Sequence, residues 1–543
     1  MTSTRASRRF RTWSSARSGA RRTCRLGSTA CTQSGWLPAP TGRRRAGRPS
    51  TSSWRSSIET QSHARSLRVI IKNRESLLSH GNVEVRRDAL DIIEAGLAAA
   101  DPYPATQRLI RIAGSRLYIG GCPEMDVSGF GDEVVDLDEV EHIYVIGAGK
   151  AVQRQALALE EILGSRLTAG AITAKKGEGA YLRRIEVTEG AHPVPDEDSL
   201  AGARKIVEIA KRAGERDLVF TIFSDGASSL FQLPAEGFTL DDLRGLYRLS
   251  IKFGLQSIIT RPMVYFSQVG CGRIARMIHP ARAVHLILCT VPYRRWRGQL
   301  PESQIFVPTW PSGRRRMEEA VREYKLEPWY DELPPAMHDA LERRDQRLEV
   351  PDLDDFRKMR ISYWQTVDSQ QMLRAAKAKA EELGYHGAIL GLWSMINTTE
   401  LAHVYGGMTR QVVRFGEPFA PPVALLSTGE MTTPIGKATG IGGRNQEFVL
   451  RVAQHFGGVA APYNLPALET GEPVGEHVVV ASVDSDGTDG PGTQFGQDAP
   501  DDFRCQAGAI ADLSTLRRAR ELGIDLSAEL RNHNSSLPLW RLQ

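Results

Sequence analysis

The chain has 543 residues, enough for two or three domains, and its 41% hydrophobic and 24% charged residues are typical of a globular protein. It contains no run of 18 or more apolar residues, so neither a membrane span nor a membrane partner is expected. The six cysteines show no CxxC pair and no metal-finger spacing, which argues against a disulfide framework or a structural zinc and favours a reducing, cytoplasmic compartment.

The net charge of +5 is unevenly distributed along the chain. Residues 1–60 contain thirteen arginines, no lysine and a single acid, Glu59, and therefore carry +12. The remaining residues must then sum to −7. The body of the protein is mildly acidic, so a nucleic-acid partner is not expected.

The N-terminal segment, residues 1–75, is rich in Arg and Ser and shows neither a helical nor a strand period. Three interpretations are open: a transit peptide, a disordered basic arm, or a spurious extension from a misplaced start site. We favour the third, because arginine without lysine is typical of an out-of-frame translation of a GC-rich gene. Ordered structure is expected from about Ser76.

After this segment, apolar strands alternate with amphipathic helices. The predicted strands are 142–146, 169–173, 217–223, 283–288, 361–367, 387–392, 422–426 and 477–483. The predicted helices are 83–100, 198–212, 240–253, 370–383 and 445–456. The pattern indicates an α/β fold, in which a parallel sheet is flanked by helices. Residues 318–349 are expected to be a charged, solvated helical connection.

Ligands of parallel α/β sheets bind at the carboxyl ends of the strands. The first candidate ligand-binding loop at such a strand end is Gly147-Ala148-Gly149-Lys150. It is neither a Walker A loop nor a full GxGxxG, since the required glycine and Ser/Thr positions are missing. It could bind an anion through Lys150, or it could be a tight turn with that lysine in solvent.

The second loop, Ser224 to Ser229, has small and hydroxylated residues that could form a nest for phosphate oxygens. The alternative is simple helix capping by Ser228 or Ser229.

The third loop is rich in glycine and runs from Gly436 to Gly443, directly before Arg444 and a helix. Glycine lets the backbone approach a ligand, a helix N-terminus attracts anions, and a guanidinium binds phosphate or carboxylate through two donors. The plain alternative is a strand–loop–helix connection with a capping arginine.

The fourth loop, Asp484 to Gly490, carries carboxylates two and three residues apart on a glycine turn. Such oxygens could hold Mg²⁺, or the loop could be a set of Asx turns. Together, the four loops supply the groups that phosphoryl transfer needs: two cationic side chains, a Ser/Gly loop for phosphate oxygens and a cluster of acidic residues for a metal ion. A hydride-transfer enzyme would need a complete dinucleotide fingerprint, which the chain lacks.

These stretches resemble the glycerate 2-kinase family that carries a C-terminal MOFRL domain, whose members are often labelled hydroxypyruvate reductase. The similarity runs from about residue 76 to 536. Its motifs are GAGKA at 147–151, GAHPVPDEDS at 190–199, STGE at 427–430, GGRNQEF at 442–448 and SDGTDGP at 485–491.

The resemblance implies an ATP-dependent kinase that phosphorylates D-glycerate, or a related hydroxy acid, at the 2-hydroxyl with Mg²⁺. It also implies a two-domain α/β fold: an N-terminal Rossmann-like parallel sheet and a smaller C-terminal MOFRL domain, with the active site in the cleft between them. The expected boundaries are 1–75 for the leader, 76–330 for the Rossmann-like domain, 331–415 for a connecting segment and 416–543 for the MOFRL domain. The oligomeric state would be a monomer or a homodimer.

By the same resemblance, Lys150 and Arg444 would be the catalytic cations, and Asp486 and Asp489 the metal carboxylates. Glu430 and Asn445 would contact the substrate. The nucleotide phosphates would be bound by Gly147, Gly149, Ser224, Gly226, Ser228, Ser229, Gly442 and Gly443.

The chain departs from the family pattern at several positions. Asp225 stands where the family usually has glycine, and Met263, Tyr265 and Gly270 replace an arginine, a histidine and a lysine. The family also continues past Gln543 through another helix and strand end. An NAD(P)H-dependent hydroxypyruvate reductase and a catalytically impaired relative that keeps the fold therefore remain as alternatives.

Overall fold

The computed structural model describes residues 70–127, 131–255, 257–288, 308–309, 316–393, 395–460, 468–469, 471–493, 496–504 and 506–542. The expectations for residues 1–69 lie outside this part of the chain. Within it, no helix is long and apolar enough to cross a membrane.

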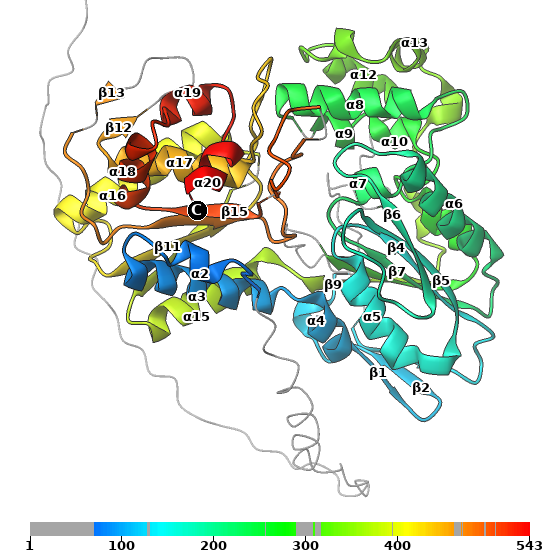
Figure 1. The fold of residues 1–543 in the computed structure, drawn as a ribbon. Helices are drawn as coiled ribbons and strands as arrows, with labels where there is room; N and C mark the ends of the chain where they lie inside the picture. Colours follow the sequence, from blue (N-terminus) through cyan, green and yellow to red (C-terminus); the bar gives the residue numbers. More distant parts are fainter. Residues whose placement is uncertain are drawn as a thin grey trace, which may run out of the picture. The chain divides into compact units, whose positions relative to one another are not determined.

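A six-stranded, fully parallel sheet forms the centre of the N-terminal part (Figure 1). The strand order is β6-β5-β4-β7-β8-β9. The strands are β4 Ile143–Ala148, β5 Leu167–Lys175, β6 Ile185–Gly190, β7 Leu218–Phe223, β8 Arg282–Leu288 and β9 Ile361–Val367. β4 and β7 are buried along their whole length, which explains why their sequences are almost continuously apolar.

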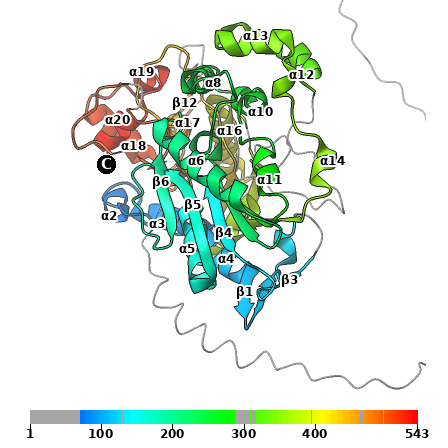
Figure 2. The same cartoon turned by 90° about the vertical axis from the view of Figure 1, so that its right-hand side faces the viewer.

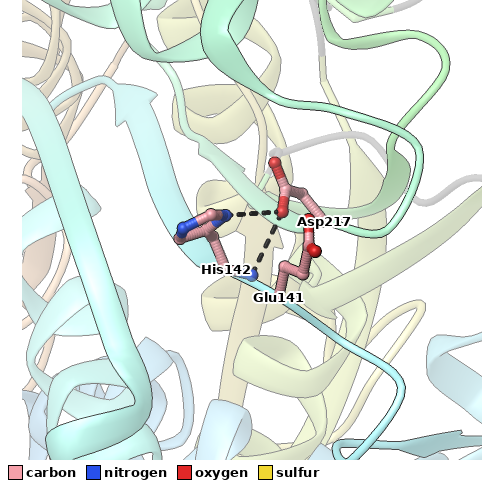
Figure 3. A group of neighbouring side chains, drawn as sticks. All are labelled: Glu141, His142 and Asp217. Carbon is pink, nitrogen blue, oxygen red and sulfur yellow. Dashed lines mark hydrogen bonds and ion pairs between the residues drawn. The ribbon is translucent and has the colours of Figure 1, made fainter.

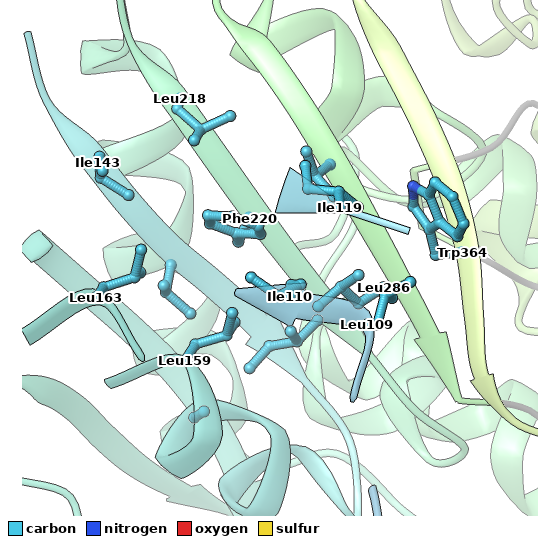
Figure 4. Close-up of a cluster of buried hydrophobic side chains, with 14 of the residues drawn as sticks. Leu109, Ile110, Ile119, Ile143, Leu159, Leu163, Leu218, Phe220, Leu286 and Trp364 are labelled. Atoms are coloured by element: carbon cyan, nitrogen blue, oxygen red, sulfur yellow. The ribbon is translucent and has the colours of Figure 1, made fainter. Parts of the chain in front are cut away.

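One face of the sheet packs against α5 (Val152–Leu163), α4 (Pro102–Leu109) and the β1–β2 hairpin (Ile110–Ala113 and Arg116–Ile119). Figure 4 shows this cluster, which includes Leu159 and Leu163 of α5 and Phe220 and Leu286 of the sheet. The opposite face is covered by α6 (Glu197–Arg212), which lies against β6, β5 and β4 (Figure 2). Because both faces are buried, only the strand ends are left to form a site.

A helical layer adjoins this sheet and has a core of its own. It contains α8 Leu240–Phe253, α9 Ser257–Thr260, α10 Met263–Phe266, α12 Met317–Tyr324 and α13 Pro335–Arg343. Trp329 and Met337 are fully buried there, packed in the same cluster as Leu243 of α8. The expectation that residues 318–349 form a solvated connection is therefore wrong, because the apolar stripes of these charged helices face one another.

The C-terminal part is built around α17 (Arg444–Phe456), which packs on α16 (Thr398–Phe415) and on the antiparallel pair β14–β15 (Val480–Val483 and Gly508–Ala511). β10 (His386–Leu392) and β11 (Val423–Thr428) pair in parallel, and α15 (Ser369–Glu382) covers them. The chain continues through α18 Leu513–Glu521, α19 Leu526–Arg531 and α20 Ser536–Leu542.

The early helix α3 (Val83–Ala99) packs against α15 and the C-terminal elements. Arg86 of α3 is 1% exposed, and its Nε lies 2.7 Å from Asp512 Oδ2 at the start of α18. A buried ion pair of this kind is costly to break, so it fixes α3 against residues more than four hundred positions away.

The remaining elements are short. They are α2 Arg74–Leu77, η1 Pro123–Met125, β3 Glu133–Asp136, η2 Gly164–Arg166, α7 Ala227–Leu230, α11 Arg273–Ile278, η3 Tyr330–Glu332, η4 Gln346–Leu348, α14 Leu353–Phe356, β12 Val459–Ala460 and β13 Leu468–Glu469.

Candidate active site

The loops after β4 and β7 interlock at the carboxyl edge of the sheet. Lys150 N donates to Asp225 O at 2.9 Å, and Ala151 N donates to Ser224 Oγ at 3.0 Å. A Cβ atom at Gly149 would lie 2.1 Å from Ser224 Oγ, and Gly149 has φ +140°. Gly149 is thus required by close packing between the loops, and Ser224 Oγ is already bonded to the backbone.

Gly147, Gly226, Ser228 and Ser229, which were also predicted to bind nucleotide phosphates, belong to the same two loops. Gly147 passes so near to β7 that an added Cβ would be 1.8 Å from Ile222 O. Ser229 Oγ donates to Gly226 O at 3.2 Å, whereas Ser228 is half-buried and its carbonyl oxygen accepts from the hydroxyl of Tyr247. Neither serine caps α7, whose N-cap Gly226 has no side-chain hydrogen bond, so the alternative of helix capping is wrong. Close packing between the loops accounts for the glycines Gly147 and Gly149.

Lys150 forms an ion pair with Asp486 across the two parts of the chain. Burial alone would lower the pKa of Lys150, but the carboxylates of Asp486 and Asp484 outweigh it and raise that pKa. The pKa of Asp486 is correspondingly lowered: burial opposes this, and the Lys150 ammonium outweighs it. Both predicted residues are therefore charged and in contact.

Arg444 opens α17 and holds two carboxylates. Its Nη1 lies 2.6 Å from Glu430 Oε1, and its Nη2 lies 3.0 Å from Asp484 Oδ2. Burial alone would lower the pKa of Arg444, but Glu430 and Asp484 outweigh it and raise that pKa. The charge of Arg444 also acts on Lys150, which places the two predicted catalytic cations in one electrostatic cluster.

Asp489 does not face this cluster as a free ligand. Its Oδ2 accepts from Gln446 N at 2.8 Å, and its Oδ1 accepts from Asn445 N and Nδ2 at 3.2 and 3.1 Å. Asn445 is engaged at its other end too, because Oδ1 accepts from Ser482 Oγ at 2.6 Å. The anion-binding N-terminus expected at α17 is thus filled by the protein's own carboxylate.

Asp489 should make the stability of the protein depend on pH. Burial raises the pKa of Asp489 to about 6, from an ordinary value of 3.8. A folded-state pKa above the unfolded one means that the native state binds more protons between these values, so stability falls as pH rises from about 4 to 6. Two pKa units correspond to about 3 kcal/mol.

We expect Asp489→Asn to remove this pH dependence. The measurement is the free energy of urea unfolding of wild type and variant at intervals between pH 4 and 7. The difference between the two proteins should change by about 2–3 kcal/mol across the window. A difference that stays constant with pH would contradict the raised pKa.

Three charged or titratable residues outside the predicted set belong to the site. Asp484 binds Arg444, as described above. His192 lies beside Gly226, where an added Cβ would be 3.2 Å from His192 Cδ2 and 2.8 Å from Lys150 Cγ. Burial, followed by the charges of Lys150, Lys175 and Arg444, lowers the pKa of His192 well below its usual value, so its imidazole is neutral. Lys175, the third, ends β5 and also acts on Asp486.

A different carboxylate group lies at the opposite, amino edge of the sheet. Figure 3 shows Glu141, His142 and Asp217, whose ligand atoms lie within 4.8 Å of one another. Asp217 already accepts from His142 N, His142 Nδ1 and Gly214 N at 3.1, 2.9 and 2.7 Å. These hydrogen bonds give the three residues a structural role, because they hold the start of β4 next to the start of β7.

The departures from the family pattern lie mostly in the core. Met263 and Tyr265 belong to α10 and are at most 1% exposed in the helical layer. Gly270 is buried and donates its amide to Ser267 Oγ at 3.1 Å. Asp225, in contrast, is exposed, and its carbonyl oxygen accepts from Lys150 N.

Comparison with known proteins identifies the family of this chain. Residues 88–298 match the family described as a domain of unknown function, DUF4147, and residues 423–542 match the MOFRL family. A putative hydroxypyruvate reductase of Agrobacterium vitis is 30% identical over 72% of this chain and 91% of its own length. The chain belongs to the glycerate 2-kinase family with a MOFRL domain.

Two further relatives carry kinase names. A glycerate 2-kinase of Pyrococcus horikoshii is 29% identical over 83% of this chain and 91% of its own length. The crystal structure of a glycerate kinase from Thermotoga maritima superposes with a TM-score of 0.56 at 25% identity, covering 84% of this chain and 94% of that one. The two-domain α/β fold expected from the sequence is confirmed by the sheet and by these neighbours.

Proposed function

We propose that this chain is an ATP-dependent kinase that phosphorylates D-glycerate, or a closely related hydroxy acid, at its 2-hydroxyl. The observation that carries the proposal is the meeting of Lys150, from the loop after β4, with Asp486, from the loop after β14, beside the Arg444 cluster. Phosphoryl transfer needs fixed positive charge around the moving group more than it needs covalent chemistry. The kinase names of the relatives support the same activity.

The carboxylates of the site fit a magnesium ion. Asp484 and Asp486 are oxygen donors at the same strand end, each now neutralised by a cation. Mg²⁺ is commonly held by one or two carboxylates plus substrate phosphates, so a larger preformed ligand set is unnecessary. We therefore propose Asp484 and Asp486 as the metal carboxylates, with Asp489 as the residue that caps α17. An ion bound there would neutralise negative charge on the phosphate oxygens of the nucleotide.

The remaining residues divide between binding and positioning. Lys150 and Arg444 would bind the transferring phosphoryl group and the substrate carboxylate, with Arg444 able to offer two parallel donors. Glu430 holds Nη1 of Arg444 while Asp484 holds Nη2, and Asn445 holds the start of α17 through Asp489. Burial, followed by the charges of Lys150, Lys175 and Arg444, lowers the pKa of His192 and keeps it neutral, and its ring lies beside Gly226 next to the Lys150 side chain.

The reductase alternative is supported by the name of the Agrobacterium vitis relative, but the chain lacks a dinucleotide fingerprint. Close packing of Gly147 against Ile222 and of Gly149 against Ser224 already requires glycine at both positions, so these glycines do not favour a bound dinucleotide. The proposal is tested by following ADP formation and NAD(P)H oxidation separately with purified protein. We expect ADP formation that depends on D-glycerate. Oxidation of NADPH that depends on hydroxypyruvate, without ADP formation, would support the reductase. If the protein shows neither of the two activities, the catalytically impaired relative is supported.

A further inference from the structure

The glycine-rich loop before Arg444 is bonded to a segment near the end of the described chain. The segment is Asn532-His533-Asn534-Ser535-Ser536, which runs from the end of α19 to the first residue of α20. Along the loop, Thr439 N donates to Asn532 Oδ1 at 3.0 Å, Ile441 N to Asn534 Oδ1 at 3.1 Å and Gly443 N to Ser535 Oγ at 3.2 Å. Alternate amides of the loop are thus satisfied by three side chains of the segment.

Backbone contacts complete this attachment. Gly440 N donates to Asn532 O at 3.1 Å, and Ser536 N donates to Ile441 O at 2.9 Å. Cβ atoms at Gly440 and Gly442 would lie 2.3 Å from Asn532 O and His533 O, respectively. The glycines are therefore required because the loop lies directly on the segment. The amides of Thr439, Gly440, Ile441 and Gly443 are already used. Of these residues, Gly443 was predicted to bind a nucleotide phosphate.

The segment is fixed to α17 as well. His533 Nδ1 lies 2.8 Å from Glu447 Oε2, and Glu447 Oε1 lies 2.8 Å from Arg451 Nε, all three side chains being buried. Ser536 Oγ donates to Gln446 Oε1 at 2.7 Å. The same segment, residues 532–536, therefore contacts both the glycine-rich loop and the first two turns of α17.

We propose that residues 532–536 form a positioning segment that holds the glycine-rich loop, and through it Arg444, in the geometry needed for phosphoryl transfer. The proposal rests on the kinase activity proposed above. Arg444 follows Gly443 directly, so a loop released from Asn534 and Ser535 lets the first turn of α17 move. Misplacing a catalytic group by about 1 Å can cost about 10²-fold in rate.

The test compares Asn534→Ala with a matched control, Asp525→Ala. Asn534 bonds both to the loop and to α19, where Nδ2 donates to Glu529 Oε2 at 2.6 Å. Asp525 caps the other end of α19 by accepting from Ser527 N and Ala528 N at 3.0 Å, and it has no bond to the loop. Both variants weaken the same helix, but only one of them releases the loop.

Two readouts separate positioning from general destabilisation. Hydrogen exchange of the loop amides should quicken about tenfold in Asn534→Ala and change less than about twofold in Asp525→Ala. The kcat of Asn534→Ala should fall about 10- to 100-fold with KM for ATP within about threefold, while Asp525→Ala keeps its kcat. Ser535→Thr, which keeps the hydroxyl, should retain more activity than Ser535→Ala.

Equal exchange of the loop in the two variants would overturn the proposal, and so would faster exchange in Asn534→Ala with unchanged kcat. Absence of turnover in the wild type would defeat the kinase function instead. In that case the exchange comparison alone still decides whether the segment holds the loop.

Discussion

Arg444→Ala should lower kcat for ATP-dependent phosphorylation by about 10³-fold or more, as removal of a transition-state arginine does in other phosphoryl-transfer enzymes. The side chain lies between Glu430 and Asp484 at the start of α17, so its guanidinium is fixed before substrate arrives. Such preorganised charge is worth far more in a partly dry site than in water. The measurement is steady-state kinetics with varied ATP and varied D-glycerate.

Two controls make the result specific to Arg444. Arg444→Lys keeps the charge but not the forked donors, and we expect it to recover only part of the lost rate. Arg517→Ala removes an exposed arginine that pairs with Glu476, and it should leave kcat unchanged. If Arg444→Ala keeps its native circular dichroism and more than about a tenth of wild-type kcat, Arg444 is not one of the catalytic cations.

Lys150→Met should lower kcat by about 10²- to 10³-fold, because the ammonium is the second fixed charge beside the reacting groups. Lys150 is paired with Asp486, and each residue holds the other in its charged form. Asp486→Asn should therefore also slow turnover. In the double variant, the loss should be no greater than that of Lys150→Met alone, since contacting residues act as a unit.

The measurement is a double-mutant cycle, in which kcat is determined for wild type, for Lys150→Met, for Asp486→Asn and for the double variant. Strictly additive losses in activation free energy would show that Lys150 and Asp486 act independently. Lys205→Met provides a control, because this lysine pairs with Glu186 on an exposed part of the sheet and lies outside the site.

Much of the fold could be predicted because its strands are buried on both faces. β7 and β9 were located within one residue by their apolar runs. β6 was missed, because as an edge strand it carries Glu186 and Glu189 and is only partly buried. α16 was missed because Gly406 and Gly407 interrupt its pattern, and Gly406 is required by the ring of His455, 2.3 Å from an added Cβ.

The candidate site was predicted in part. Lys150 follows the end of β4, a usual place for ligand-binding residues in a parallel sheet, whereas Arg444 opens α17 after β11 of a separate sheet. Sheet topology alone therefore does not predict that these two residues belong to one site. No local pattern could show that Asp489 would cap a helix beginning 45 residues earlier, or that Asn534 would occupy the amide of Ile441. The glycines suggested a phosphate cradle because close backbone packing and ligand binding call for the same residue.

The most direct test of the account is the position of the phosphoryl group in the product. Purified protein, ATP, Mg²⁺ and D-glycerate should give a product whose phosphorus couples, in ³¹P–¹H NMR, to the single proton on carbon 2, and Arg444→Ala under the same conditions should give none. Phosphorylation of carbon 3, or a product signal of equal size from Arg444→Ala, would contradict the proposed site.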